Sequence, residues 1–183
     1  FQDRFPGKPA AKLPVAPEGS KWTFSNLADY LTTGEGAHGN VQRGALVFEK
    51  SQCIKCHRYG DSGEVIGPDL SNIRKRFTKK EILESIVFPS HVISDQYRSQ
   101  QIVTTDGRIY DGLVVPGPGE QWIVLQSNGQ KITVPKGQVE TVETSKQSSM
   151  PAQLLDKLTL EEITDLFAYL GVLPKTAVAR RPE

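Results

Sequence analysis

Hydrophobic positions follow a helical spacing in four segments of the chain. Each segment is preceded by Thr or Asn, residue types whose side chains cap helix N-termini. Two of the segments also carry a Glu three residues after the cap, which is the spacing of a capping box. The pattern predicts helices capped at Thr23, Asn40, Thr78 and Thr159, the third ending before Pro89 and the fourth at Gly171.

The periodicity changes between residues 97 and 144, where short β-rich runs replace the helical spacing. The dipeptides Asp106-Gly107 and Asn128-Gly129 separate some of these runs, and both are strong signals for tight turns between antiparallel strands. Counting the turns gives about five strands. The predicted fold is therefore mainly α-helical with an inserted small antiparallel β module, α+β overall.

The first part of the chain has a different composition. Four prolines fall within residues 1–20, which predicts a linker or a surface arm. We expect residues 1–38 to form an N-terminal extension with one short helix, and residues 39–183 to form one domain with the β-rich insert at 97–144. The chain begins with Phe1, which suggests a piece of a longer product.

Charge and hydropathy exclude two classes of partner. The formal net charge of the 183 residues is +1, so no overall field attracts nucleic acid. No apolar run approaches the roughly 18 residues that a membrane-spanning helix needs. We therefore expect neither a nucleic-acid partner nor a membrane span in this chain.

The candidate chemistry lies in FEKSQCIKCHRYG (48–60), which holds the only two cysteines, Cys53 and Cys56, followed directly by His57. A dithiol couple normally begins a helix after a strand, but here a predicted helix precedes the pair. A structural zinc site needs four ligands, and the remaining histidines, His38 and His91, are isolated. In C-x-x-C-H, two thiols bond one haem covalently and the adjacent imidazole reaches the iron. The spacing favours haem c over zinc and a dithiol couple.

Two downstream segments fit the same interpretation. An iron-ligating histidine usually donates its second ring N–H to an oxygen, and the carbonyl of Pro68 is a candidate acceptor for His57. Met150, the only methionine, precedes a proline in a polar stretch and is the candidate for the sixth iron ligand. The alternatives are that Met150 fills a core gap, or that His91 is the sixth ligand.

With these motifs the chain resembles the class I cytochromes c. The sequences GALVF (44–48) and LFAYL (166–170) are similar to the paired terminal helices of that family, in which Gly44 would allow close backbone contact. From Gly39 to Val172, including FPSHVISDQYRS and TTDGRIYDGLVV, the chain is more specifically similar to the planctomycete-type haem-binding domain. That domain is often found at the C-terminal end of large exported dehydrogenase-like proteins.

The resemblance implies an electron-transfer protein rather than an enzyme, in which one covalent haem c has His57 and Met150 as axial ligands. It also implies a periplasmic or otherwise exported location, and a redox partner protein or fused dehydrogenase domain. The candidates for the apolar wall of the haem pocket are Leu70, Ile73, Leu83 and Ile86.

Two other functions remain open. One is a haem-based sensor or small-ligand-binding domain with a labile sixth ligand, because an inserted module beside a haem can control access to it. The other is an interaction module whose haem is only structural.

Overall fold

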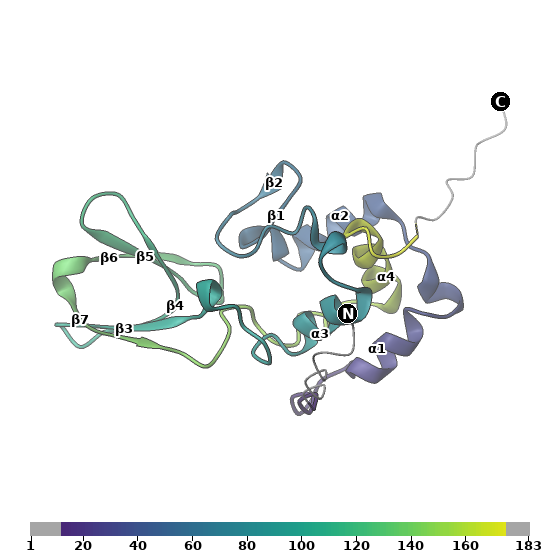
Figure 1. The fold of residues 1–183 in the computed structure, drawn as a ribbon, viewed down its shortest axis with the longest axis horizontal. Helices are drawn as coiled ribbons and strands as arrows, with labels where there is room; N and C mark the ends of the chain where they lie inside the picture. Colours follow the sequence, from purple (N-terminus) through teal and green to yellow (C-terminus); the bar gives the residue numbers. More distant parts are fainter. Residues whose placement is uncertain (1–11, 175–183) are drawn as a thin grey trace, which may run out of the picture.

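The computed structural model describes residues 12–174. Residues 1–11, which include the first half of the predicted proline-rich arm, and residues 175–183 lie outside the described range. The fold is mixed: helices gather in one part of the molecule and a five-stranded antiparallel sheet forms another (Figure 1). No helix within residues 12–174 has the length and apolar character to cross a lipid bilayer.

All four predicted helices are present with the predicted caps. The Thr23 and Asn40 side chains each accept a backbone N–H three residues ahead, and Thr78 and Thr159 form complete capping boxes. Gly171 has a φ of 76°, the left-handed conformation that ends a helix readily. The helices are α1 (Phe24–Tyr30), α2 (Val41–Lys50), α3 (Lys79–Val87) and α4 (Leu160–Tyr169).

The crossing of α2 and α4 organises the larger hydrophobic core. A Cβ added at Gly44 of α2 would lie 2.0 Å from the carbonyl oxygen of Asp165 in α4, so only glycine permits this backbone contact. Phe48 and Tyr169 pack beside the crossing, with ring centroids 5.6 Å apart. The predicted packing of these two helices is confirmed. The sequence did not indicate the buried Asp165 carboxylate, which accepts the Asn40 N–H at 2.6 Å and pairs with Arg43.

The N-terminal helix is part of this core. Leu27 of α1 and Leu31, which follows the helix directly, are fully buried in one cluster with residues of α2, α3 and α4. The Lys79 ammonium at the start of α3 donates to the Leu31 carbonyl at 2.6 Å. The predicted short helix of the extension therefore packs as part of the helical unit.

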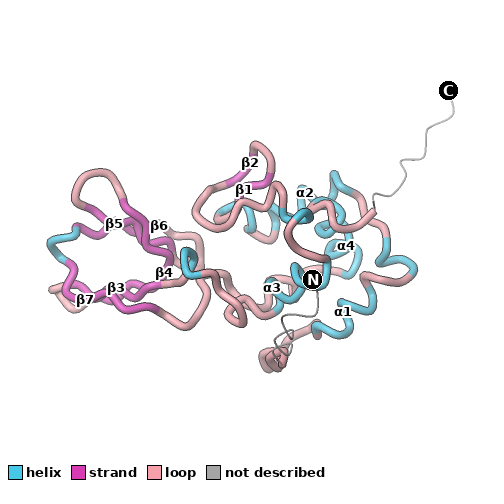
Figure 2. Tube along the Cα trace, in the orientation of Figure 1, coloured by secondary structure: helices cyan, strands magenta, loops and turns pink. Residues whose placement is uncertain are grey.

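The β module contains the five predicted strands, in the order β6-β5-β4-β3-β7 (Figure 2). The first half of β4 pairs with β3 and the second half with β5. Gly112 lies between the two halves, where an added Cβ would meet the Leu125 carbonyl oxygen at 2.1 Å. Ile102, Val124 and Val134 fill a small core of their own. The strands are β3 (Gln100–Thr104), β4 (Ile109–Pro116), β5 (Gln121–Leu125), β6 (Lys131–Pro135) and β7 (Val139–Thr144).

The two ends of the module lie side by side. Gln100 at the start of β3 pairs with Thr144 at the end of β7. Both predicted turn glycines, Gly107 and Gly129, have positive φ angles near 80°. The chain therefore leaves the helical unit, forms the sheet and returns to the same place.

The sequence pattern did not predict the shortest elements of the described residues. A two-stranded ribbon, β1 (Arg58–Tyr59) with β2 (Ser62–Gly63), follows the Cys pair directly. Short 3₁₀ turns are η2 (Gly34–Ala37), η3 (Cys53–Lys55), η4 (Ile73–Lys75), η5 (Asp95–Tyr97) and η6 (Lys136–Gln138).

Candidate functional site

The C-x-x-C-H motif forms one tight turn after α2. Gln52 adopts a left-handed conformation with a φ of 62°, which turns the chain out of the helix. The backbone N–H groups of Cys56 and His57 then both donate to the Cys53 carbonyl, at 3.1 and 2.9 Å. This turn holds two thiols and one imidazole together in a single short segment.

The His57 imidazole has a fixed orientation. Its Nδ1 lies 2.8 Å from the Pro68 carbonyl oxygen, the contact expected from the sequence. Because that oxygen can only accept a hydrogen bond, Nδ1 carries the proton and Nε2 keeps its lone pair. Burial lowers the pKa of His57, and the hydrogen bond to Pro68 opposes this shift only in part. A neutral imidazole with a free Nε2 is the form that ligates a metal.

Two glycines make room for this histidine. A Cβ at Gly67 would lie 2.9 Å from Cε1 and 3.1 Å from Nδ1 of the His57 ring. A Cβ at Gly63 would lie 2.2 Å from the His57 carbonyl oxygen, and Gly63 has a φ of 98°. The ring and the backbone of His57 are therefore each enclosed by a residue without a side chain.

The segment GPDL (67–70) is fastened to the residues that follow the Cys pair. The Leu70 N–H donates to the Arg58 carbonyl at 2.8 Å, and the Arg58 guanidinium forms an ion pair with Asp69. Hydrogen bonds from Ser71, and then from Arg58, lower the pKa of Asp69 to about 2. Asp69 is therefore ionised at neutral pH. The sequence analysis did not identify this pair, which holds the Pro68 carbonyl in place.

The surroundings of the two cysteines argue against a dithiol redox couple and against a structural zinc site. Burial raises the pKa of the Cys53 thiol to about 11 and also raises that of Cys56. The nucleophilic thiol of a dithiol couple instead has a lowered pKa. Within residues 12–174, no group of three or more His, Cys, Asp or Glu side chains is placed to hold a metal ion. The donor set thus lacks the ligands of a structural zinc site.

The four candidates for an apolar wall lie in one hydrophobic cluster with Cys53. Leu83 is 1% exposed in the large core, and Leu70, Ile73 and Ile86 are half-buried against it. Cys53 and Ile54 pack against the same cluster. The structure therefore places these residues in the same hydrophobic cluster as the first part of the C-x-x-C-H turn. Their contact with a haem stays a prediction.

Met150 lies in a segment whose position is restrained by hydrogen bonds to serine hydroxyls. The Met150 side chain is half-buried, and its N–H donates to the Ser148 hydroxyl at 3.1 Å. The Ser148 N–H donates to the hydroxyl of Ser90 at 3.0 Å, and the hydroxyls of Ser149 and Ser99 lie 2.7 Å apart. We call residues 145–150 the strap. The role of Met150 as an iron ligand stays a prediction.

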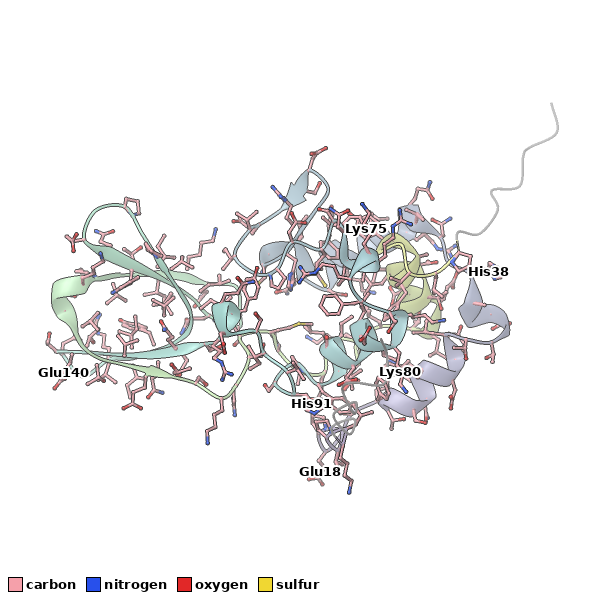
Figure 3. All side chains as sticks on the ribbon, viewed as in Figure 1. Glu18, His38, Lys75, Lys80, His91 and Glu140 are labelled. Carbon is pink, nitrogen blue, oxygen red and sulfur yellow. The ribbon has the colours of Figure 1, made fainter. Side chains whose placement is uncertain are left out.

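The two remaining histidines, His38 and His91, lie apart from each other (Figure 3). His91 follows α3, and its Nδ1 lies 3.0 Å from a Glu84 carboxylate oxygen. Its side chain is 16% exposed. His38 follows η2 and is exposed. His91 thus already has a partner for one ring nitrogen.

The β module contacts the C-x-x-C-H turn directly. The Lys131 ammonium at the start of β6 forms an ion pair with Glu64 at 3.1 Å. A Cβ at Gly129 would meet Lys55, which lies between the two cysteines, at 2.9 Å from its Cδ. The tip of the β5–β6 hairpin therefore lies against the C-x-x-C-H turn. No local sequence signal indicated this contact.

Residues 41–107 match the cytochrome c family model. The match supports a class I cytochrome c, and with it haem c and an electron-transfer role. It includes α2, the C-x-x-C-H turn and α3, whereas Met150 and α4 lie beyond it.

One curated protein supports the same assignment. The chain is 34% identical over 58 residues to a subunit of nitric oxide reductase from Halomonas halodenitrificans. The aligned segment covers 32% of this chain and 37% of that protein. The comparison therefore concerns about a third of each protein and neither protein as a whole.

Proposed function

We propose that the protein is a monohaem c-type cytochrome that carries single electrons between redox partners. Cys53 and Cys56 would hold haem c covalently, and His57 and Met150 would be the protein ligands of its iron. The observation that carries the proposal is the hydrogen bond from His57 Nδ1 to the Pro68 carbonyl. It leaves Nε2 free as a ligand beside two thiols, within the segment that matches cytochrome c.

The residues of the turn fit a haem. Because residues 63 and 67 are glycines, the chain comes close to the His57 carbonyl and to the His57 ring, and this close packing restricts the orientation of the imidazole. Haem c, when bound, supplies an iron that changes by one electron. The apolar wall excludes water and lowers the local dielectric, and the Pro68 carbonyl holds the His57 proton on Nδ1.

The proposed architecture is a class I cytochrome c helical fold with the β module inserted between the fifth and sixth ligands. The close crossing of α2 and α4 at Gly44 supports it. The similarity from Gly39 to Val172 leads us to propose the planctomycete-type haem-binding domain as the subtype. With it we propose an exported or periplasmic location and a domain boundary near residue 38.

The proposed partner is a redox protein or a fused dehydrogenase domain, so the chain itself carries electrons and is not an enzyme. The similarity to a protein named as a reductase subunit supports a place within a larger redox assembly.

A pyridine haemochrome spectrum tests covalent attachment. The protein is produced with an export signal in a bacterial host that carries haem-attachment machinery. We expect the spectrum of a haem with both vinyl groups saturated, and haem that stays with the protein in acidified acetone. A double variant with Cys53→Ala and Cys56→Ala should lose both properties. Extractable haem, or none, in the unmodified protein would refute the proposal.

The contact between the β5–β6 hairpin and the C-x-x-C-H turn favours one second candidate. This candidate is a haem-based sensor or small-ligand-binding domain with a labile sixth ligand. A module that touches the turn can open or close access to the iron. Carbon monoxide distinguishes the two functions. Prompt, stoichiometric binding to the reduced protein favours the sensor, and resistance favours electron transfer.

Gly67→Ala is expected to disturb His57. The new methyl group would lie 2.9 Å from Cε1 of the ring, so either the ring or the 67–68 backbone must shift. Overpacking of this kind costs about 1 to 3 kcal/mol. We expect a lower Tm of the holoprotein with covalent haem retained, measured by circular dichroism.

The matched control is Gly137→Ala, because a Cβ at Gly137 meets nothing within 4 Å. Equal Tm values for the two alanine variants would show that Gly67 does not enclose the ring.

A further inference from the structure

We propose that Ser99 is a positioning residue for Met150. Its buried hydroxyl binds the strap next to the start of β3 and so restrains the position of Met150 relative to the C-x-x-C-H turn. This inference rests on the proposed function, because it takes Met150 as the sixth ligand. It adds a residue that lies far from the ligand in sequence, immediately before β3.

Both polar groups of Ser99 that face the strap are engaged. Ser99 is 5% exposed. Its hydroxyl lies 2.7 Å from the Ser149 hydroxyl, next to Met150, and its carbonyl accepts the Ser145 N–H at 2.8 Å. Because a buried hydroxyl without a partner is costly, the contact between the two serines resists separation. Ser99 therefore holds the strap at both of its ends.

A second set of contacts sets the direction of the strap. The Ser148 N–H donates to Ser90, in the loop after α3, while Ser149 binds Ser99 on the other side. The Met150 N–H donates back to the Ser148 hydroxyl. Neighbouring residues of the strap are thus bound to the helical unit and to the β module, which restrains the backbone directly before the thioether.

The β module can act as an anchor because its other end is also attached. Two contacts join the β5–β6 hairpin to the C-x-x-C-H turn and the ribbon that follows it. They are the Lys131–Glu64 ion pair and the close contact of Gly129 with Lys55. The same module therefore contacts the segment of the fifth ligand and the strap of the sixth. A thioether is a weak iron ligand, so the restraint on its backbone determines how often it leaves the iron.

The test is a titration of the ferric holoprotein with imidazole, which competes for the sixth position. Ser99→Ala is expected to tighten apparent imidazole binding about fivefold, the ratio that corresponds to one net hydrogen bond of about 1 kcal/mol. The far-red band of the methionine-ligated ferric haem should weaken in parallel. Ser149→Ala should give the same shift.

The double variant identifies the interaction. If the two hydroxyls act through their contact, Ser99→Ala with Ser149→Ala should shift the affinity by about fivefold, no more than either single change. The matched control is Ser25→Ala, at an exposed serine of α1, which should bind imidazole as the unmodified protein does.

Two outcomes would overturn the positioning role. One is an unchanged imidazole affinity and far-red band in Ser99→Ala, and the other is a double variant whose shift is the product of the single shifts. Met150→Ala, measured alongside, separates this failure from failure of the ligand assignment. If Met150→Ala keeps the band, the ligand assignment is wrong and the positioning role is overturned with it. If it loses the band while Ser99→Ala is unaffected, only the role of Ser99 is wrong.

Discussion

Replacing Met150 by alanine is expected to abolish the weak far-red band of the ferric protein and to lower its reduction potential. A thioether stabilises ferrous iron relative to a nitrogen ligand or water, so its loss favours the ferric state. We expect a decrease on the order of 100 mV, within the range of about 0.8 V that axial ligands span. Absorption spectroscopy and potentiometric titration measure the two effects.

The structure makes this substitution a clean test. Met150 is the only methionine in the chain, so no second methionine thioether can restore the band. Its side chain is half-buried, and the hydrogen bonds of the strap use serine groups and the Met150 backbone rather than the Met150 side chain. The alanine variant should therefore keep the strap in place and leave the sixth position open. The reduced variant should then bind carbon monoxide promptly.

His91→Ala is the matched control, because His91 is the alternative sixth ligand. Its Nδ1 is bonded to Glu84, and we expect this variant to keep both the band and the potential. The opposite pattern, in which Met150→Ala changes neither property and His91→Ala changes both, would assign the sixth position to His91.

Local features of the fold could be predicted from the sequence because their causes are local. A Thr followed three residues later by Glu satisfies two backbone N–H groups within one turn, so the starts of α3 and α4 follow from four residues each. Asp106-Gly107 and Asn128-Gly129 supply the positive φ angles that tight turns need. The His57–Pro68 hydrogen bond was likewise expected, because both residues belong to one short segment.

Contacts between segments that are distant along the chain have no local sequence pattern that predicts them. The Asp165 carboxylate caps the start of α2 across more than 120 residues, and in the sequence it is one acidic residue among several on α4. The Lys131–Glu64 pair and the Ser99–Ser149 contact depend on how the β module folds back onto the helical unit. Charge and hydroxyl groups of these types are common, so only the three-dimensional arrangement selects the pairs that form.

Gly44→Leu is expected to cause the largest loss of stability among the substitutions considered. The first added atom, Cβ, would lie 2.0 Å from the Asp165 carbonyl oxygen and 2.7 Å from the Tyr169 Cβ. Both neighbours belong to α4, and the oxygen is backbone, so no rotation of a side chain relieves the contact. The helices must separate, which exposes Phe48 and weakens the hydrogen bond from Asn40 to Asp165.

We expect a decrease of at least about 3 kcal/mol in the free energy of unfolding, at the upper end of overpacking costs. For a domain of this size, that corresponds to about 6 to 12 °C in Tm. Gly137→Leu adds the same side chain where a Cβ meets no neighbour and should shift Tm by less than about 2 °C. Because α4 lies beyond the segment that matches cytochrome c, this pair of variants tests its packing independently of the comparison. Similar Tm values for both leucine variants would mean that α2 and α4 do not cross at Gly44.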